Sequence, residues 1–142
     1  MEAQTLYDMF ETDSKLEAEG VEIRLGKNAD KTVRIFIIGA MYKTNPKYMK
    51  ALEKVTQEYK AQLQTETLTG EQAEEINLQV FVDTVLFGWK NIHDREGKPV
   101  MFTKKAAIKL FTDLPRLYDI LVNEASKASR FRAAKMEADS GN

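Results

Sequence analysis

The stretch of residues 69–91, TGEQAEEINLQVFVDTVLFGWKN, limits what this chain can fold into more than any other part of the sequence. Drawn as a helix, it places its apolar residues on two adjoining lines: Ile76, Val80 and Phe87 on one, and Leu78, Phe81, Val82, Val85 and Trp89 on the other. Together the two lines cover more than half of the helix circumference, which is typical of a helix that packs on several sides. Thr69 and Gln72 have the spacing of a capping box and mark the helix start. The stretch therefore predicts a central helix, with Trp89 as a core residue.

The rest of the composition indicates one ordinary domain. A chain of 142 residues can bury roughly two-thirds of its unfolded surface. The net charge of -1 predicts no strong attraction to DNA or to an anionic membrane. Cysteine is absent, which excludes disulfides and thiolate chemistry and fits a reducing cytoplasm. The first ten residues, MEAQTLYDMF, lack the apolar core of a signal peptide, and the longest apolar run is too short to cross a bilayer.

The N-terminal third predicts an arm followed by a β-hairpin. Residues 1–19 are expected to form the arm, for which a partly ordered tail is favoured over docking through its few apolar side chains. Residues 20–26 alternate apolar and polar side chains, and residues 31–38 are rich in β-branched and aromatic ones. Two such runs joined by a short polar turn predict an antiparallel hairpin. Because a lone hairpin is marginal, it must pack on a helix or pair with another strand.

The second strand of this hairpin is apolar on both faces. Val33, Ile35 and Ile37 share one face, and Phe36 and Ile38 make the other face apolar too. The second apolar face predicts either packing or a protein-partner site. Packing is favoured, and Phe36 and Ile38 remain partner candidates.

Helical patterns fill the rest of the chain. Asn45 and Pro46 predict the start of a helix that runs to about Gln64. Thr103 caps a short helix over about 104–111, and a last helix runs from near 115 to about 135. The predicted fold class is α+β, mainly α, with a two-stranded hairpin and about four helices around the central one. Residues 20–135 form this single domain, and residues 136–142 form a frayed tail.

No residue pattern predicts catalysis, a metal site or a cofactor, so the chain is not expected to be an enzyme. His93 lies beside Asp94 in a polar loop, but no flanking motif supports acid/base catalysis, and an exposed loop histidine is favoured. The same loop fails as an EF-hand because Ile92 stands at the first ligand position. Asp83, in the apolar part of the central helix, is expected to face outward or to bond a neighbouring helix end.

Two basic surfaces have both a structural and a functional interpretation. The lysines on the helix that starts at Asn45 are expected to form a solvated face, which is favoured over a nucleic-acid surface. Near the end of the last helix, Phe131 lies between Arg130 and Arg132. The favoured interpretation is that the arginines stabilise the helix dipole while Phe131 closes the domain's own core. The alternative is that these three residues contact a protein client, pairing with acidic side chains beside its apolar stripe.

Residues 74–131 also resemble a known family. The matching features are the segments DTVLFGWKNI, DREGKPVMFT, KKAAIKLFTDLP and LYDILVNEASKASRFR, in this order. They resemble the tail assembly chaperones of long-tailed bacteriophages with non-contractile tails, the siphovirus type. The resemblance extends over roughly residues 21–132, and His93 departs from the small or acidic residue expected at its position.

The resemblance implies a non-enzymatic role in the cytoplasm of the bacterial host. Such chaperones bind the long tape measure protein, keep it soluble and help to recruit tail tube subunits, and many phages also make a longer, frameshifted form. Self-association is an additional expectation, whereas membrane binding is not expected. Two alternatives remain: a minor structural tail protein that stays in the virion, and, with less support, a nucleic-acid-binding module.

Overall fold

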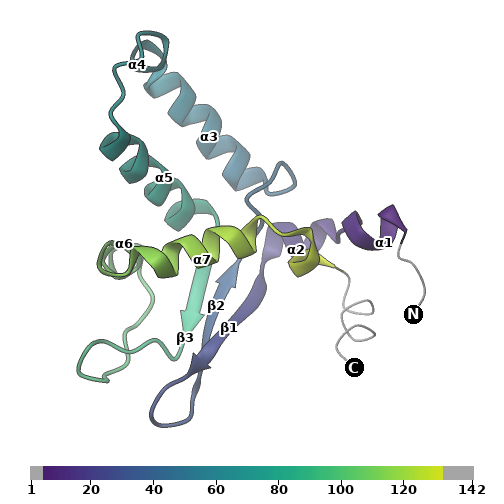
Figure 1. Ribbon diagram of the computed structural model, residues 1–142, viewed down its shortest axis with the longest axis vertical. Helices are drawn as coiled ribbons and strands as arrows, with labels where there is room; N and C mark the ends of the chain where they lie inside the picture. Colours follow the sequence, from purple (N-terminus) through teal and green to yellow (C-terminus); the bar gives the residue numbers. More distant parts are fainter. Residues whose placement is uncertain (1–4, 133–142) are drawn as a thin grey trace.

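Three antiparallel strands, in the order β1-β2-β3, form the centre of the fold, and α7 lies across one face of them (Figure 1). The computed structural model describes residues 5–132. Its elements are α1 (Leu6–Phe10), α2 (Ser14–Glu19), β1 (Val21–Lys27), β2 (Val33–Ile38), α3 (Pro46–Glu58), α4 (Lys60–Gln64), α5 (Gly70–Thr84), β3 (Leu86–Lys90), α6 (Lys104–Asp113), α7 (Pro115–Ala125) and the 3-10 helix η1 (Ala128–Phe131). The fold is α+β and mainly α, as the sequence predicts.

The third strand corrects the prediction of a two-stranded hairpin and of a helix that continues to residue 91. Helix α5 ends at Thr84, and the next residues form β3, which pairs with β2. Thr84 and Val85 are β-branched and Gly88 is a weak helix former, so the helix loses local support there. The strand gains its support from β2, whose second edge would otherwise have no partner. The apolar residues of 69–91 therefore belong to two successive elements, helix α5 and strand β3.

The register of the sheet places three large apolar side chains side by side on its inner face. Ile23 pairs with Phe36, and Phe36 pairs with Trp89 on the other side. The rings of Phe36 and Trp89 meet edge to face, with their centroids 6.0 Å apart. Trp89 is only 8% exposed, and its indole Nε1–H donates to the Val100 carbonyl at 2.8 Å. Trp89 is therefore a core residue as predicted, although it lies on a strand.

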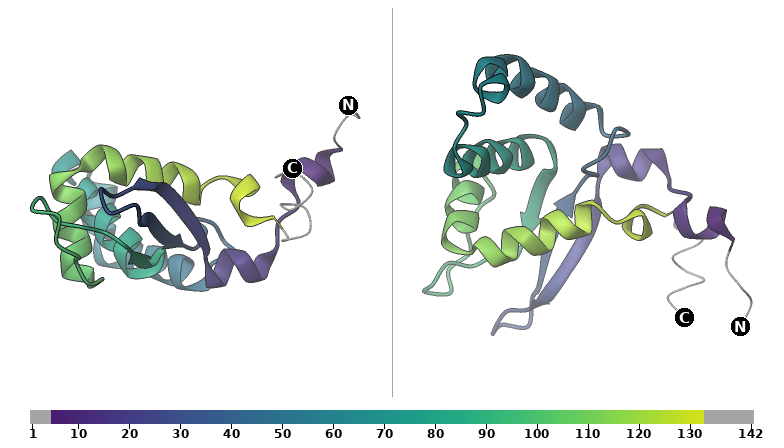
Figure 2. Two further views of the ribbon diagram at one scale, coloured as in Figure 1. Left: turned by 90° about the horizontal axis from the view of Figure 1, so that it is seen from below. Right: turned by 45° about the horizontal axis from the view of Figure 1, so that its top comes forward.

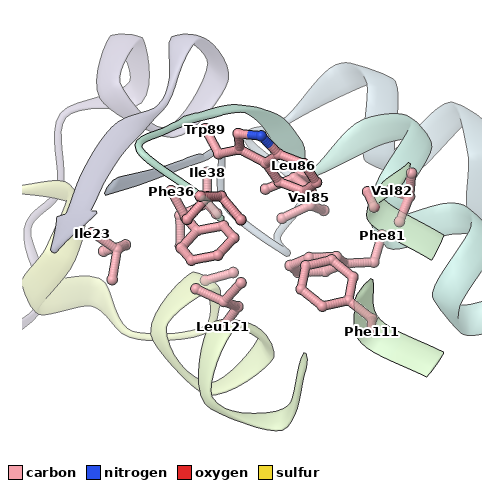
Figure 3. Close-up of a cluster of buried hydrophobic side chains, with 13 residues drawn as sticks. Ile23, Phe36, Ile38, Phe81, Val82, Val85, Leu86, Trp89, Phe111 and Leu121 are labelled. Atoms are coloured by element: carbon pink, nitrogen blue, oxygen red, sulfur yellow. The ribbon is translucent and has the colours of Figure 1, made fainter. Parts of the chain in front are cut away.

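The helices complete the core through a cluster of aromatic rings (Figure 3). Phe81 of α5 is fully buried, with ring centroids 6.0 Å from Phe111 of α6 and 5.2 Å from Tyr118 of α7. Phe111 also lies 6.4 Å from Phe36 of the sheet. Leu121 of α7 is fully buried beneath the same sheet face. The four elements therefore share one continuous core.

Asn45 joins three segments of the chain from a fully buried position. Its Oδ1 caps α3 by accepting from the backbone N–H of Tyr48 at 3.4 Å. Its Nδ2 donates to the carbonyls of Ala40 and Thr84, each at 3.0 Å. One side chain thus fixes the start of α3, the end of β2 and the point where α5 gives way to β3.

We expect Asn45→Ala to lower the free energy of unfolding by about 2–3 kcal/mol, because it removes a helix cap and leaves two buried carbonyls without their donor. Urea unfolding followed by circular dichroism measures the change. The matched control is Asn77→Ala on the exposed side of α5, which should leave the midpoint within the error of the measurement. Equal midpoints for the two variants would show that Asn45 does not carry this role.

Helices α3, α4 and α5 form a hairpin that projects from the sheet (Figure 1). Asn45 caps α3 and a Thr69–Gln72 capping box starts α5, as the sequence predicts. The predicted continuous helix to Gln64 is instead broken at Tyr59, where α4 begins without a side-chain cap. No side chain of α3, which is described over its whole length, is fully buried. Helix α3 therefore keeps much of its surface open to solvent.

The last helix is shorter than predicted. Helix α7 ends at Ala125, and after Ser126 the backbone becomes extended at Lys127 before η1. The Ser126 hydroxyl donates to the Val122 carbonyl at 2.9 Å, a local bond that competes with helix continuation. The predicted end near Lys135 and the predicted tail over 136–142 lie outside the described residues.

Candidate functional site

The predicted partner residues Arg130, Phe131 and Arg132 lie where η1 meets the N-terminal arm, α1 and α2. Phe131 is buried, with only 1% of its surface exposed. Its carbonyl accepts from the backbone N–H of Asp13 at 2.7 Å. Arg132 Nη2 donates to the Met9 carbonyl at 3.3 Å, at the end of α1. In the folded chain these residues attach the arm to the domain, and Phe131 is buried in the domain's own core, which is the interpretation favoured from the sequence.

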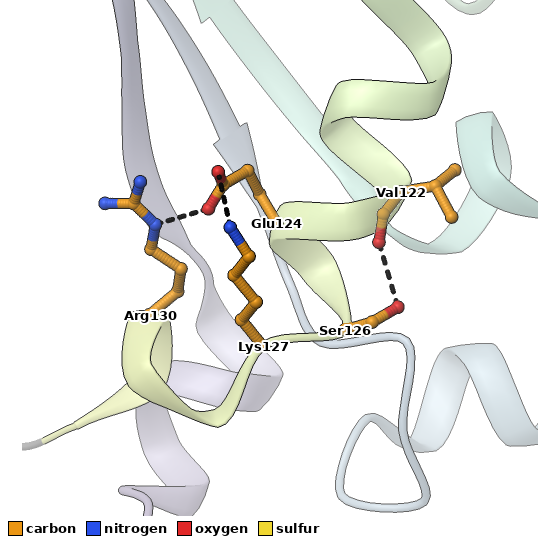
Figure 4. A network of polar contacts seen from close by, with 5 residues as sticks. All are labelled: Val122, Glu124, Ser126, Lys127 and Arg130. Atoms are coloured by element: carbon orange, nitrogen blue, oxygen red, sulfur yellow. Dashed lines mark hydrogen bonds and ion pairs between the residues drawn. The ribbon is translucent and has the colours of Figure 1, made fainter.

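Arg130 and Lys127 both pair with Glu124 of α7 (Figure 4). Arg130 donates through Nε to one carboxylate oxygen, and Lys127 Nζ lies 3.3 Å from the other. The hydrogen bond from Arg130 and then that from Lys127 hold the pKa of Glu124 below its ordinary value. These cations therefore interact with a half-buried carboxylate of the same domain, in addition to any effect of the helix dipole.

Phe36 and Ile38 point into the core, where Phe36 is 2% exposed and Ile38 is fully buried. Both side chains are therefore packed in the core, as the interpretation favoured from the sequence predicts. The other face of β2 is less covered, because Ile35 and Ile37 are only half-buried. On that face Phe87 lies over Gly39, where a Cβ would come within 2.7 Å of its ring.

An open groove of about 570 Å³ is the feature that sequence reasoning missed. Its large apolar side chains come from the sheet, from the loop after β3, from α6 and from the α6–α7 corner: Leu25, Phe36, Ile92, Leu110, Leu114 and Leu117. It also carries charges of both signs, from strand β2 and from two nearby loops: Arg34 of β2, Asp30 of the β1–β2 turn, and Asp94 and Arg95 of the loop after β3. Leu114 is 48% exposed although it joins two helices. No single segment could have indicated this groove, because three segments far apart in sequence form it.

Side-chain amides hold the loops of the groove in place. Asn28 in the β1–β2 turn donates through Nδ2 to the Asn91 carbonyl at 2.7 Å. Asn91 in turn donates through its own Nδ2 to the Val33 carbonyl at 2.8 Å. The turn and the loop after β3 are therefore fastened to each other, and the wall of the groove is preformed.

The His93–Asp94 pair forms part of this loop. The Asp94 carboxylate accepts from the backbone N–H groups of Glu96 and Lys98, each at 2.9 Å. These hydrogen bonds hold the pKa of Asp94 below its ordinary value, and the bond from Lys98 has the largest effect. His93 pairs with Pro99 in an isolated β-bridge. Both residues therefore have positions that shape the loop.

Other polar residues singled out from the sequence also have contacts within the fold. Asp83 faces solvent and pairs with Lys104 at the start of α6 at 3.5 Å, in agreement with the prediction that it bonds a neighbouring helix end. Across residues 5–132, no group of three or more acidic or histidine side chains is arranged to hold a metal ion. The same residues contain no helix that is long and apolar enough to span a membrane.

Comparison with known protein families finds one matching family. The sequence profile of the YdaY prophage proteins matches residues 43–142, which is more than half of the chain. The chain belongs to the YdaY prophage protein family. It is therefore of phage origin. No curated protein and no solved structure is matched by the chain.

The YdaY match covers most of the candidate groove. It begins just before α3 and includes β3, the loop after it, and helices α6 and α7. The two leucines at the α6–α7 corner, Leu114 and Leu117, lie within it, whereas the β-hairpin of residues 21–38 precedes it. The family segment therefore contributes one wall of the groove, and the hairpin contributes the other.

Proposed function

We propose that this member of the YdaY family is a non-enzymatic tail assembly chaperone that binds the tape measure protein of its phage and helps the tail tube to assemble. Its prophage family and the resemblance of residues 74–131 to such chaperones support the proposal. The resembling segments build β3, the loop after it, and helices α6 and α7. These are the elements that contribute most of the groove.

The open apolar groove is the observation that carries this function. A tape measure protein is expected to consist largely of long amphipathic helices, whose apolar stripes need cover before the tail forms. An amphipathic helix binds a partner by laying its apolar face into such a groove. Leu114 and Leu117 line the groove and supply apolar contacts, and a few such anchoring contacts contribute most of the binding energy of an interface.

The charged side chains at the rim can orient a client helix in the groove. Arg34 and Arg95 lie beside Asp30 and Asp94, so the rim is not uniform in sign. Charges at the edge of an interface affect partner choice and encounter rate more than affinity. The groove is therefore suited to a client helix with charged residues of both signs beside its apolar stripe.

The test is co-expression with the tape measure protein encoded by the same prophage. We expect the chain to keep that protein soluble and to co-purify with it. Leu114→Ser should abolish both effects while leaving the melting temperature unchanged. The matched control is Ile120→Ser, because Ile120 lies on α7 outside the groove and is 47% exposed, against 48% for Leu114. Equal recovery of the client with both variants would remove the groove from consideration.

The protein composition of purified virions tests the role itself. A chaperone is made during assembly and should be absent from finished particles. Stoichiometric amounts of the chain in washed virions would instead identify a structural tail component. Failure of the chain to co-purify with the tape measure protein would contradict the proposed function.

A further inference from the structure

The N-terminal helix α1 exposes an apolar stripe that residues 5–132 leave uncovered. Leu6, Tyr7 and Phe10 are 73%, 77% and 64% exposed. Their spacing of three and four residues places them on one side of the helix. The helix is nevertheless well formed, since Thr5 and Asp8 make a complete capping box. Exposed apolar clusters of this kind mark interaction sites.

Helix α1 is held away from the rest of the domain. In each of the three views it projects past η1, on the side opposite the α3–α5 hairpin (Figures 1 and 2). The Asp13–Phe131 and Met9–Arg132 hydrogen bonds fix it there. The stripe is therefore exposed. The arm also approaches the start of α3, where the Thr44 hydroxyl donates to Glu17 at 2.6 Å.

Helix α3 has the complementary surface. Met49 is 42% exposed, and it lines a shallow hollow on α3 together with Leu52, Lys50 and Glu53. Residues 43–54 contain four lysines and one glutamate, whereas residues 1–11 contain three acidic side chains and no basic one. The apolar helix α1 with its acidic neighbours is thus complementary in charge to the lysine-rich start of α3, which also has apolar side chains.

We propose that the arm of one copy docks on α3 of a second copy, with Leu6, Tyr7 and Phe10 against Met49 and Leu52. Glu11 then lies among the α3 lysines. If two copies exchange arms reciprocally, each contact raises the effective concentration of the other, so short arms suffice. The client groove at the α6–α7 corner lies outside this contact, so the inference is independent of the proposed function.

Sedimentation velocity of the full chain over a range of concentrations tests the association. We expect a dimer that dissociates on dilution and weakens as salt rises. The triple variant Leu6→Ser, Tyr7→Ser, Phe10→Ser should stay monomeric with an unchanged melting temperature. Lys50→Glu should raise the dissociation constant at least tenfold, and adding Glu11→Lys should restore part of the loss. A wild-type monomer at every concentration, or a dimer that the triple variant keeps, would overturn the proposal.

Cross-linking tests which surfaces meet, and the absence of cysteine makes the reading unambiguous. Tyr7→Cys and Met49→Cys chains are purified separately, mixed and oxidised. We expect a disulfide-linked heterodimer as the main product. The control replaces Met49→Cys by Met101→Cys, since Met101 is 85% exposed on a different loop. Equal yields of the disulfide-linked heterodimer from both mixtures would contradict docking on α3. A Tyr7→Cys, Met49→Cys double variant that forms its disulfide only within one chain would contradict exchange of arms between copies.

Discussion

Trp89→Ala is expected to lower the free energy of unfolding by about 3–5 kcal/mol. The indole fills the space between Phe36 and Phe102, with ring centroids 6.0 and 5.0 Å away, and it holds the loop after β3 through the bond to Val100. Alanine leaves a cavity in the sheet face and an unpaired carbonyl. Chemical denaturation followed by circular dichroism measures the loss.

Trp89→Phe separates the two contributions. Phenylalanine keeps an aromatic ring in the site but has no donor for the Val100 carbonyl, so the cost should fall to about 1–2 kcal/mol. If Trp89→Ala melts at the wild-type temperature, the side chain is exposed in solution. Trp89 would then become a candidate for partner binding instead of a core residue.

Phe131→Ala is expected to cost a similar amount, about 3–5 kcal/mol, because the ring is 1% exposed and joins the arm to the domain. The arm should also loosen, because the backbone carbonyl of residue 131 that accepts from Asp13 loses the buried ring that fixes its position. Thermal unfolding measures the first effect, and hydrogen exchange at residues 5–19 measures the second.

Arg130→Gln is the matched control at the neighbouring position. It removes one cation from Glu124 at a surface where Arg130 is 48% exposed, so its effect should stay below about 1 kcal/mol. Phe131→Ala combined with Arg132→Ala distinguishes the two interpretations of this region. A double variant that keeps its melting temperature but loses the tape measure protein would restore the prediction of a client contact at these residues.

Local signals in the sequence located most helix starts. Asn45, Thr69 and Thr103 each cap the helix predicted for them, because capping depends on residues within one turn. Strand β3 was missed because a short, fully apolar run has no period that separates strand from helix. Its identity is set by β2, which lies far away in the sequence. The end of α7 was missed for a different reason: the apolar seam continues in the sequence to Ala128, but the backbone becomes extended at Lys127.

In the candidate site, too, local sequence indicates some features and distant residues determine others. Arg130, Phe131 and Arg132 stood out in the sequence as an unusual cluster, but their partners Met9 and Asp13 lie at the other end of the chain. The groove could not be predicted because it exists only where a turn, a loop and a helix corner meet. Residue patterns indicated which side chains were unusual, and the fold decided which of them remain accessible.

The position of β3 has a consequence for how the chain folds during synthesis. Strand β2 is joined to β3 through the Ile38–Leu86 pair, and the α3–α5 hairpin lies between them in sequence. The hairpin β1–β2 leaves the ribosome first, but two strands alone are marginal. The sheet is completed only when roughly fifty further residues have been made and the entropy of closing that loop has been overcome. We expect the α3–α5 hairpin, whose contacts are local, to fold before the sheet is complete and so to shorten that loop.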